Sequence, residues 1–149
     1  MPTCTRKLEF DAGHRVWNHG GKCRWPHGHR YVVEVTAQSG ELNELGMVID
    51  FGDLKTVCGD FIDQRLDHGF MVYEKDIQML DALNLLDDSK VQVLPFNPTA
   101  ENLSQWLFTE FRTLLLAREI EVTRVMLYET PNCWAAAIGA NIPVTPGGT

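Results

Sequence analysis

Three of the five histidines in the sequence, His14, His27 and His29, have a spacing that could bring their imidazoles together. His27 and His29 are two residues apart, so in an extended strand their side chains point to the same side. If the segments before and after the intervening loop pair as a hairpin, His14 comes next to both. Three converging imidazoles bind Zn²⁺ and leave its fourth tetrahedral position open for catalysis. The alternative is a polar loop whose histidines are exposed to solvent.

Cys23 lies four residues before His27, between Lys22 and Arg24. Nearby cations and a metal favour the thiolate, which acts as a base or a nucleophile. A cysteine here can also be a fourth zinc ligand, which makes the site structural, or an inert thiol. The residue types leave these three possibilities open. The remaining cysteines are spread without a CxxC pair, and we expect reduced thiols at Cys4, Cys58 and Cys133.

Two acidic positions are further candidates. Asp67 directly precedes His68, and a carboxylate beside an imidazole can orient it and raise its basicity. A histidine at a helix end is also often just solvated. Glu129 ends an apolar strand, where a carboxylate can accept two N–H bonds from a heterocycle such as a pterin, or simply face solvent.

The elements that must position these residues have the pattern of an α+β domain. Strands are predicted over 4–12 and 30–38, with a long irregular loop over 14–29 between them. Asp50 and Thr99 are predicted N-caps of two helices with apolar residues at helical spacing. Two further strands follow over 122–129 and 133–138. This order favours a four-stranded antiparallel sheet with two helices on one face.

Length and composition limit the remaining possibilities. A chain of 149 residues with 44% hydrophobic residues is predicted to form a single domain over 1–149, with 141–149 a loose tail. Residues 71–95 read as an insertion with a short helix over about 76–86 and a strand-like segment over 91–94. The net charge of −7 argues against a protein that coats nucleic acid. Without a signal-peptide core or an apolar run of ~20 residues, we expect a cytoplasmic protein with no membrane partner.

Six segments, taken in order, resemble the 6-pyruvoyl-tetrahydropterin synthase family, which includes the bacterial 6-carboxytetrahydropterin synthases. The gap of three residues between Cys23 and His27 is similar to that of the carboxy-forming branch, whereas the pyruvoyl-forming branch typically has a longer one. Gly13 stands where the family usually has alanine. The matching segments are Phe10 to His14, Cys23 to His29, Met47 to Phe51 with Leu54 and Lys55, Leu66 to His68, Asn97 to Asn102, and Glu129 to Pro131.

The resemblance implies a tunnelling fold, in which subunits join their sheets around a barrel, commonly as a dimer of trimers. It also implies one Zn²⁺ per subunit and a site that needs a neighbouring subunit. It implies that His14, His27 and His29 bind zinc and that Cys23 transfers protons with Asp67 and His68 of a neighbouring subunit. It further implies that Glu129 binds the pterin and takes part in the proton relay, and that Thr99 and Glu101 line the pterin pocket.

The implied activity is that of a lyase acting on 7,8-dihydroneopterin triphosphate. The carboxy-forming branch releases triphosphate and acetaldehyde and makes 6-carboxytetrahydropterin for 7-deazaguanine (queuosine-type) synthesis. Three alternatives remain: a synthase that stops at the pyruvoyl product, a related tunnelling-fold aldolase or cyclohydrolase, and a non-enzymatic module in which Cys23 completes a structural zinc site.

The charge is distributed unevenly along the chain. Residues 1–30 carry six basic and two acidic residues, a net charge of +4, and residues 31–149 carry seven basic and 18 acidic residues, a net charge of −11. The positive segment holds Cys23 and the three histidines. We therefore expect a local cationic mouth that attracts a triphosphate, formed by Arg15, Lys22, Arg24 and Arg30.

Overall fold

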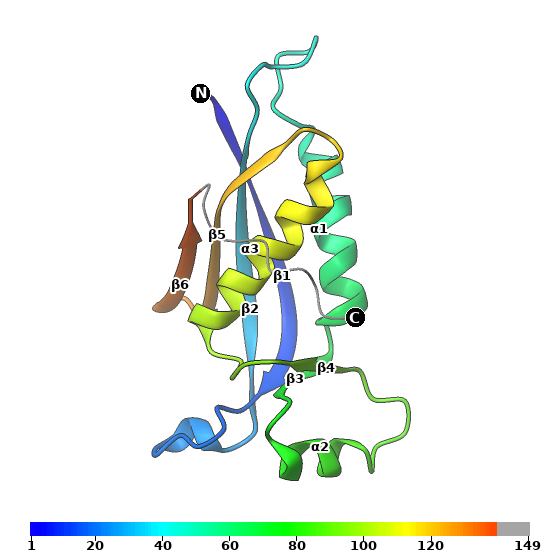
Figure 1. Ribbon diagram of the computed structural model, residues 1–149, viewed down its shortest axis with the longest axis vertical. Coiled ribbons are helices and arrows are strands. Elements are labelled where there is room, and N and C mark those ends of the chain that lie inside the picture. Colours follow the sequence, from blue (N-terminus) through cyan, green and yellow to red (C-terminus); the bar gives the residue numbers. More distant parts are fainter. Residues whose placement is uncertain (140–149) are drawn as a thin grey trace.

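The computed structural model describes residues 1–139, so the tail predicted over 141–149 lies outside the described residues. Residues 1–139 form one six-stranded sheet and three α-helices (Figure 1). The helices are α1 (Phe51–Arg65), α2 (Ile77–Leu83) and α3 (Ala100–Leu116), and a 3₁₀ helix spans Lys22–Arg24. In spatial order the strands are β4 (Val91–Leu94), β3 (Gly69–Tyr73), β1 (Thr3–His14), β2 (His27–Gln38), β5 (Glu121–Thr130) and β6 (Cys133–Ile138).

Strands β1 and β2 form a long antiparallel hairpin at the centre of the sheet. Their register runs without a break from Thr3 opposite Gln38 to His14 opposite His27. Because successive side chains of a strand alternate between faces, one face of this hairpin is apolar, with Phe10 and Tyr31 fully buried in the core. The same face continues to the ends of both strands, where it carries the three histidines.

Helices α1 and α3 cover the apolar face of the sheet (Figure 1). Both predicted N-caps are confirmed. The Asp50 carboxylate accepts a hydrogen bond of 2.6 Å from the Gly52 N–H, and the Thr99 hydroxyl accepts one of 3.2 Å from the Asn102 N–H. The helices then bury Leu54 and Ile62 from α1 and Leu103, Leu107 and Phe111 from α3 against the strands.

The α+β class is as expected, but the prediction of a four-stranded antiparallel sheet with two helices is wrong. Strand β3 pairs parallel to β1 over Ala12–His14, and β4 pairs parallel to β3. Parallel pairing needs a crossover, which α1 supplies for β3, and no local pattern marks such a distant pairing. The segment over 71–95 is therefore part of the sheet: its helix is shorter than predicted and its strand-like end is β4.

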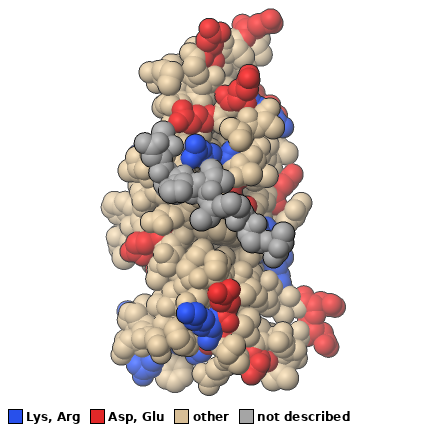
Figure 2. Space-filling model, in the orientation of Figure 1, with Lys and Arg blue, Asp and Glu red and all other residues tan. Residues whose placement is uncertain are grey.

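The irregular part of the predicted 14–29 loop is also shorter, since β1 and β2 continue to His14 and from His27. Segment 15–26 and helix α2 lie together at one end of the molecule (Figure 1). Figure 2 shows basic and acidic side chains next to each other at that end. Within residues 1–139, no helix is both long and apolar enough to cross a membrane.

Candidate active site

The hairpin register brings His14, His27 and His29 together at one end of the sheet. His14 and His27 are directly opposite each other, and their Nε2 atoms are 3.1 Å apart. The ligand atoms of all three histidines lie within 4.8 Å of one another. Two nitrogens bound to one tetrahedral zinc at ~2.0–2.1 Å are about 3.3 Å apart, so the cluster needs little adjustment to hold the ion.

The hydrogen bonds around the cluster fix which ring nitrogens are free. Nδ1 of His14 donates to the Pro98 carbonyl and Nδ1 of His27 donates to the Trp25 carbonyl, both at 2.7 Å. Because a carbonyl oxygen can only accept, each Nδ1 carries a proton, and in the neutral form of each ring Nε2 presents a lone pair. Two lone pairs 3.1 Å apart repel each other unless a cation lies between them, and the donor set therefore fits a metal ion.

His29 completes this fit. Its Nε2 is buried and has no hydrogen-bond partner among the described residues, and the nearest carboxylate oxygen of Glu129 is 3.9 Å away. Leaving a buried polar atom unpaired is costly, and a metal ion satisfies it. Burial lowers the pKa of His14 to about 4, and burial and His27 also lower the pKa of His29. These two ligands are therefore neutral at pH 7, as metal binding requires.

Glu129, at the end of β5, lies beside the cluster and is half-buried. Burial is the main cause that raises the pKa of its carboxyl, and the Glu101 carboxylate raises it further, whereas His27 opposes the shift. Glu101 is in the first turn of α3, directly after the Thr99 cap. The structure therefore places Glu101 close enough to Glu129 to raise its pKa, and the role of Glu129, Thr99 and Glu101 in binding a pterin stays a prediction.

Tyr31 is a candidate that the sequence reasoning missed. It follows His29 by two residues on β2, and their rings are in edge contact with centroids 5.4 Å apart. Its hydroxyl is buried without a partner in the described part of the chain, and burial with the Glu129 charge raises its pKa. The alternation that groups the histidines also predicts Tyr31 on their face, so the signal was present in the sequence.

Cys23 lies in the 3₁₀ helix and is half-buried. Its sulfur is not in the group of ligand atoms that lie within 4.8 Å of one another, which argues against a fourth zinc ligand. Among residues 1–139 it makes no hydrogen bond with Asp67 or His68. The chain by itself therefore does not bring the predicted proton acceptor to its predicted partners.

Asp67 and His68 do pair with each other, at 2.9 Å between Oδ2 and Nδ1. The Asp11 N–H donates to Asp67 Oδ1 and is the largest of the causes that lower the pKa of that carboxyl. The His68 N–H donates to the Asp11 carbonyl, and His68 has a positive φ of 59°. These bonds attach the pair to the edge of β1 and leave the His68 side chain 78% exposed.

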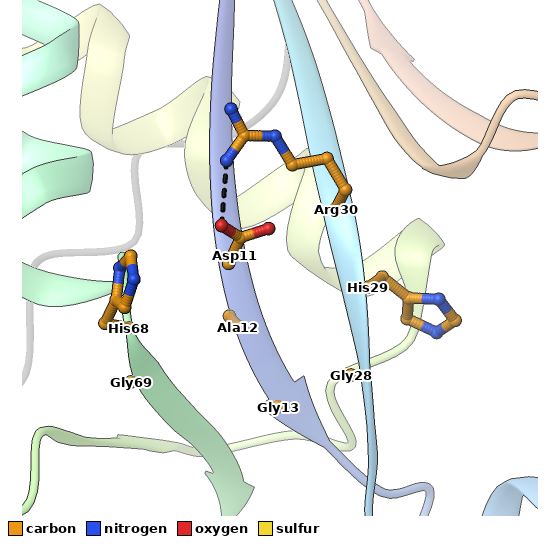
Figure 3. Close-up of a pocket in the computed structure, with 8 residues that line it drawn as sticks. All are labelled: Asp11, Ala12, Gly13, Gly28, His29, Arg30, His68 and Gly69. Carbon is orange, nitrogen blue, oxygen red and sulfur yellow. Dashed lines mark hydrogen bonds and ion pairs between the residues drawn. The ribbon is translucent and has the colours of Figure 1, made fainter.

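The Asp67–His68 pair and the three histidines lie on opposite sides of the central hairpin. Figure 3 shows the His29 ring directed away from Asp11 and His68, with β1 and β2 between them. An open hollow of about 370 Å³ is lined by His68 with residues of β1, β2 and the start of β3, among them Gly13 and Gly28. Whether the pair serves the site of another subunit stays a prediction.

The predicted cationic mouth is smaller than expected. Arg15 is bound to Asp76 of the α2 N-cap, and Arg30 is bound to Glu9 and Asp11 on the His68 side of the hairpin. Lys22 and Arg24 remain next to Cys23. Arg24 also lies over the Trp25 ring, with its guanidinium carbon 5.3 Å from the ring centroid.

Comparisons with known proteins identify the family of the chain. Residues 3–139 match the family model described as 6-pyruvoyl tetrahydropterin synthase. The chain is 42% identical over 135 residues to the 6-carboxy-5,6,7,8-tetrahydropterin synthase of Rickettsia conorii, covering 90% of this chain and 98% of the relative. It is 33% identical to the Haemophilus influenzae protein of the same name, covering 85% and 92%.

Two solved structures share the fold. An uncharacterized protein from Wolinella succinogenes superposes with a TM-score of 0.81 at 26% identity, covering 93% of this chain and 98% of that one. The 6-pyruvoyl tetrahydropterin synthase of Caenorhabditis elegans superposes with a TM-score of 0.66 at 24% identity, covering 93% and 96%.

Proposed function

Since the chain belongs to the 6-pyruvoyl tetrahydropterin synthase family, we propose that it is a zinc-dependent 6-carboxy-5,6,7,8-tetrahydropterin synthase. Its substrate is 7,8-dihydroneopterin triphosphate, and its products are 6-carboxytetrahydropterin, acetaldehyde and triphosphate, in 7-deazaguanine synthesis. The observation that carries the proposal is the group of three converging imidazoles with an unpaired His29 Nε2 beside Glu129.

In this proposal His14, His27 and His29 hold one Zn²⁺ per subunit. When bound, the ion supplies a Lewis acid that acidifies the C–H bonds next to the oxygens of the substrate side chain. Glu129 binds the pterin by accepting from a ring N–H and the adjacent amino group. The raised pKa of Glu129 supports this role, because a half-buried carboxylate gains most from donors that replace the lost water. Thr99 and Glu101 line the same pocket.

Cys23 accepts a proton from the substrate side chain, and His68, oriented by Asp67, assists the transfer. The exposed His68 ring is available to a second subunit, and the Asp67 carboxylate holds its Nδ1, which leaves Nε2 free to exchange a proton. The Lys22 and Arg24 side chains attract the triphosphate.

This division of the site requires a homo-oligomer, for which we propose a dimer of trimers. The sheet has two edges that can take part. Strand β1 is paired with β3 only over Ala12–His14, and β6 is the last strand at the other end of the described sheet. Trp134 and Ile138 of β6 are 54% and 69% exposed. Joining the edges of neighbouring copies closes a barrel and covers these side chains.

The deciding experiment is product identification by mass spectrometry after zinc-loaded protein is incubated with 7,8-dihydroneopterin triphosphate. We expect 6-carboxytetrahydropterin together with acetaldehyde. A pyruvoyl product without acetaldehyde would assign the chain to the other branch of the family.

Cys23→Ala tests the role of the thiol. This variant should bind zinc with unchanged stoichiometry but give no turnover. Cobalt substitution distinguishes the non-enzymatic alternative, since an intense sulfur-to-metal charge-transfer band would place Cys23 on the metal and contradict the proposal.

A further inference from the structure

Cys23 lies on a segment with little regular structure of its own. Residues 15–26 connect β1 to β2, and their only helical turn is the 3₁₀ helix around Cys23. The Val16 N–H donates to the Cys23 carbonyl at 2.8 Å, so the start of the segment and the cysteine are attached to each other. Contacts that fix residues 15–17 therefore also restrain the position of Cys23.

The strongest attachment of this segment is to the helix α2. Arg15 binds both carboxylate oxygens of Asp76, with Nε 2.6 Å from Oδ2 and Nη2 on Oδ1. Asp76 is 1% exposed, and its Oδ1 also accepts from the Met79 N–H as the N-cap of α2. A two-pronged Arg–carboxylate pair of this kind fixes orientation as well as distance.

Two further contacts hold the next residues. The Asn97 amide donates to the Trp17 carbonyl at 3.0 Å, and its oxygen accepts from the Trp17 N–H at 2.8 Å. The Trp17 ring is in edge contact with Tyr73 at the end of β3, with centroids 5.6 Å apart. Residues of the insertion over 71–95 and of the turn before α3 thus contact segment 15–26 and hold it in place.

We propose that α2, through the Arg15–Asp76 pair, is a positioning device that holds the Cys23 segment in place for proton transfer. The inference rests on the proposed function of Cys23. A base must lie within hydrogen-bond reach of the proton that it accepts, and a site on a loop is less precise than one on a helix or strand unless something supports it. The insertion provides that support, and Arg15 and Asp76 are positioning residues that do not touch the substrate.

The test uses Asp76→Asn in the zinc-loaded, full-length protein. Asparagine has the same shape and keeps an oxygen for the Met79 N–H, but it removes the charge that fixes Arg15. We expect the amides of residues 15–26 to exchange hydrogen about tenfold faster and Cys23 to be alkylated several-fold faster, both followed by peptide mass spectrometry. We expect kcat to fall about tenfold, with KM and zinc content unchanged.

Arg118→Gln is the matched control. It removes a charge from the exposed Arg118–Asp53 pair, with atoms 3.9 Å apart, which joins the far ends of α3 and α1. It should leave all five measurements (hydrogen exchange, Cys23 alkylation, kcat, KM and zinc content) unchanged. Arg15→Gln combined with Asp76→Asn removes both charges and should recover part of the protection that Asp76→Asn loses, because no buried charge is then left unpaired.

Unchanged exchange over residues 15–26 and unchanged Cys23 alkylation in folded Asp76→Asn would overturn the proposal. If Asp76→Asn does not fold, the same measurements on Arg15→Lys decide, since lysine keeps the charge but not the two-pronged geometry. If the unmodified protein makes no pterin product, the proposed function fails, but exchange and alkylation still test whether α2 holds the segment.

Discussion

Replacing Tyr31 by phenylalanine should make the metal-free protein more stable. The hydroxyl of Tyr31 is fully buried and, among the described residues, has no hydrogen-bond partner. Leaving a buried donor unpaired costs about 1–3 kcal/mol, and Tyr31→Phe removes that cost. The ring stays in place, because its stacked contact with Phe10, at 4.9 Å between centroids, does not involve the oxygen.

The expected gain is about 1–2 kcal/mol in the free energy of unfolding, measured by urea denaturation. At about 2–4 °C per kcal/mol for a chain of this size, Tm should rise by about 2–8 °C in calorimetry. Tyr128→Phe is the control, since Tyr128 is only half-buried, on the strand face away from the helices, and should change stability by less than about 0.5 kcal/mol.

The same substitution should weaken the enzyme. A polar group kept at a cost in stability is typical of a functional site, and this hydroxyl lies close enough to Glu129 for its charge to raise the Tyr31 pKa. We expect Tyr31→Phe to lower kcat/KM about 2- to 10-fold, because it removes a polar group beside Glu129. A destabilised Tyr31→Phe protein with unchanged kcat/KM would refute the reasoning, because the hydroxyl would then have a structural partner.

Three further predictions concern the same end of the sheet. The pKa of His14 is about 4 in the folded protein against 6.5 in the unfolded chain, so the unfolded chain binds the extra proton between these pH values. The metal-free protein should therefore lose about 3 kcal/mol in its free energy of unfolding as the pH falls from 6.5 to 4. His14→Gln should flatten that part of the pH–stability curve. Glu129→Gln should raise the Kd for a pterin about 10- to 100-fold by isothermal titration while zinc content by atomic absorption stays the same. Gly13→Ala should cost about 1–3 kcal/mol in urea denaturation, because the added Cβ would lie 2.7 Å from Phe70 Cδ2, and Phe70→Leu in the same chain should recover most of that loss. An equally stable Gly13→Ala protein would show that the Phe70 ring moves aside freely.

Local sequence pattern was enough to predict much of the site. The two-residue spacing of His27 and His29, with a hairpin back to His14, predicted the convergence that the register produces. The capping residues Asp50 and Thr99 marked the starts of both long helices. These features depend on neighbours in sequence and on strand alternation, which act within a few residues.

The parts that the sequence left undecided all depend on distant pairing. Strand β3 lies against β1 through contacts between residues 12–14 and 69–71, and this pairing places Asp67 and His68 at the β1 edge, away from the three histidines. The Arg15–Asp76 pair joins residues 61 positions apart and removes Arg15 from the cations available to a triphosphate. Burial and pairing of charges are properties of the packed chain, so only the tertiary structure decides which charged side chains are free and which hold the site together.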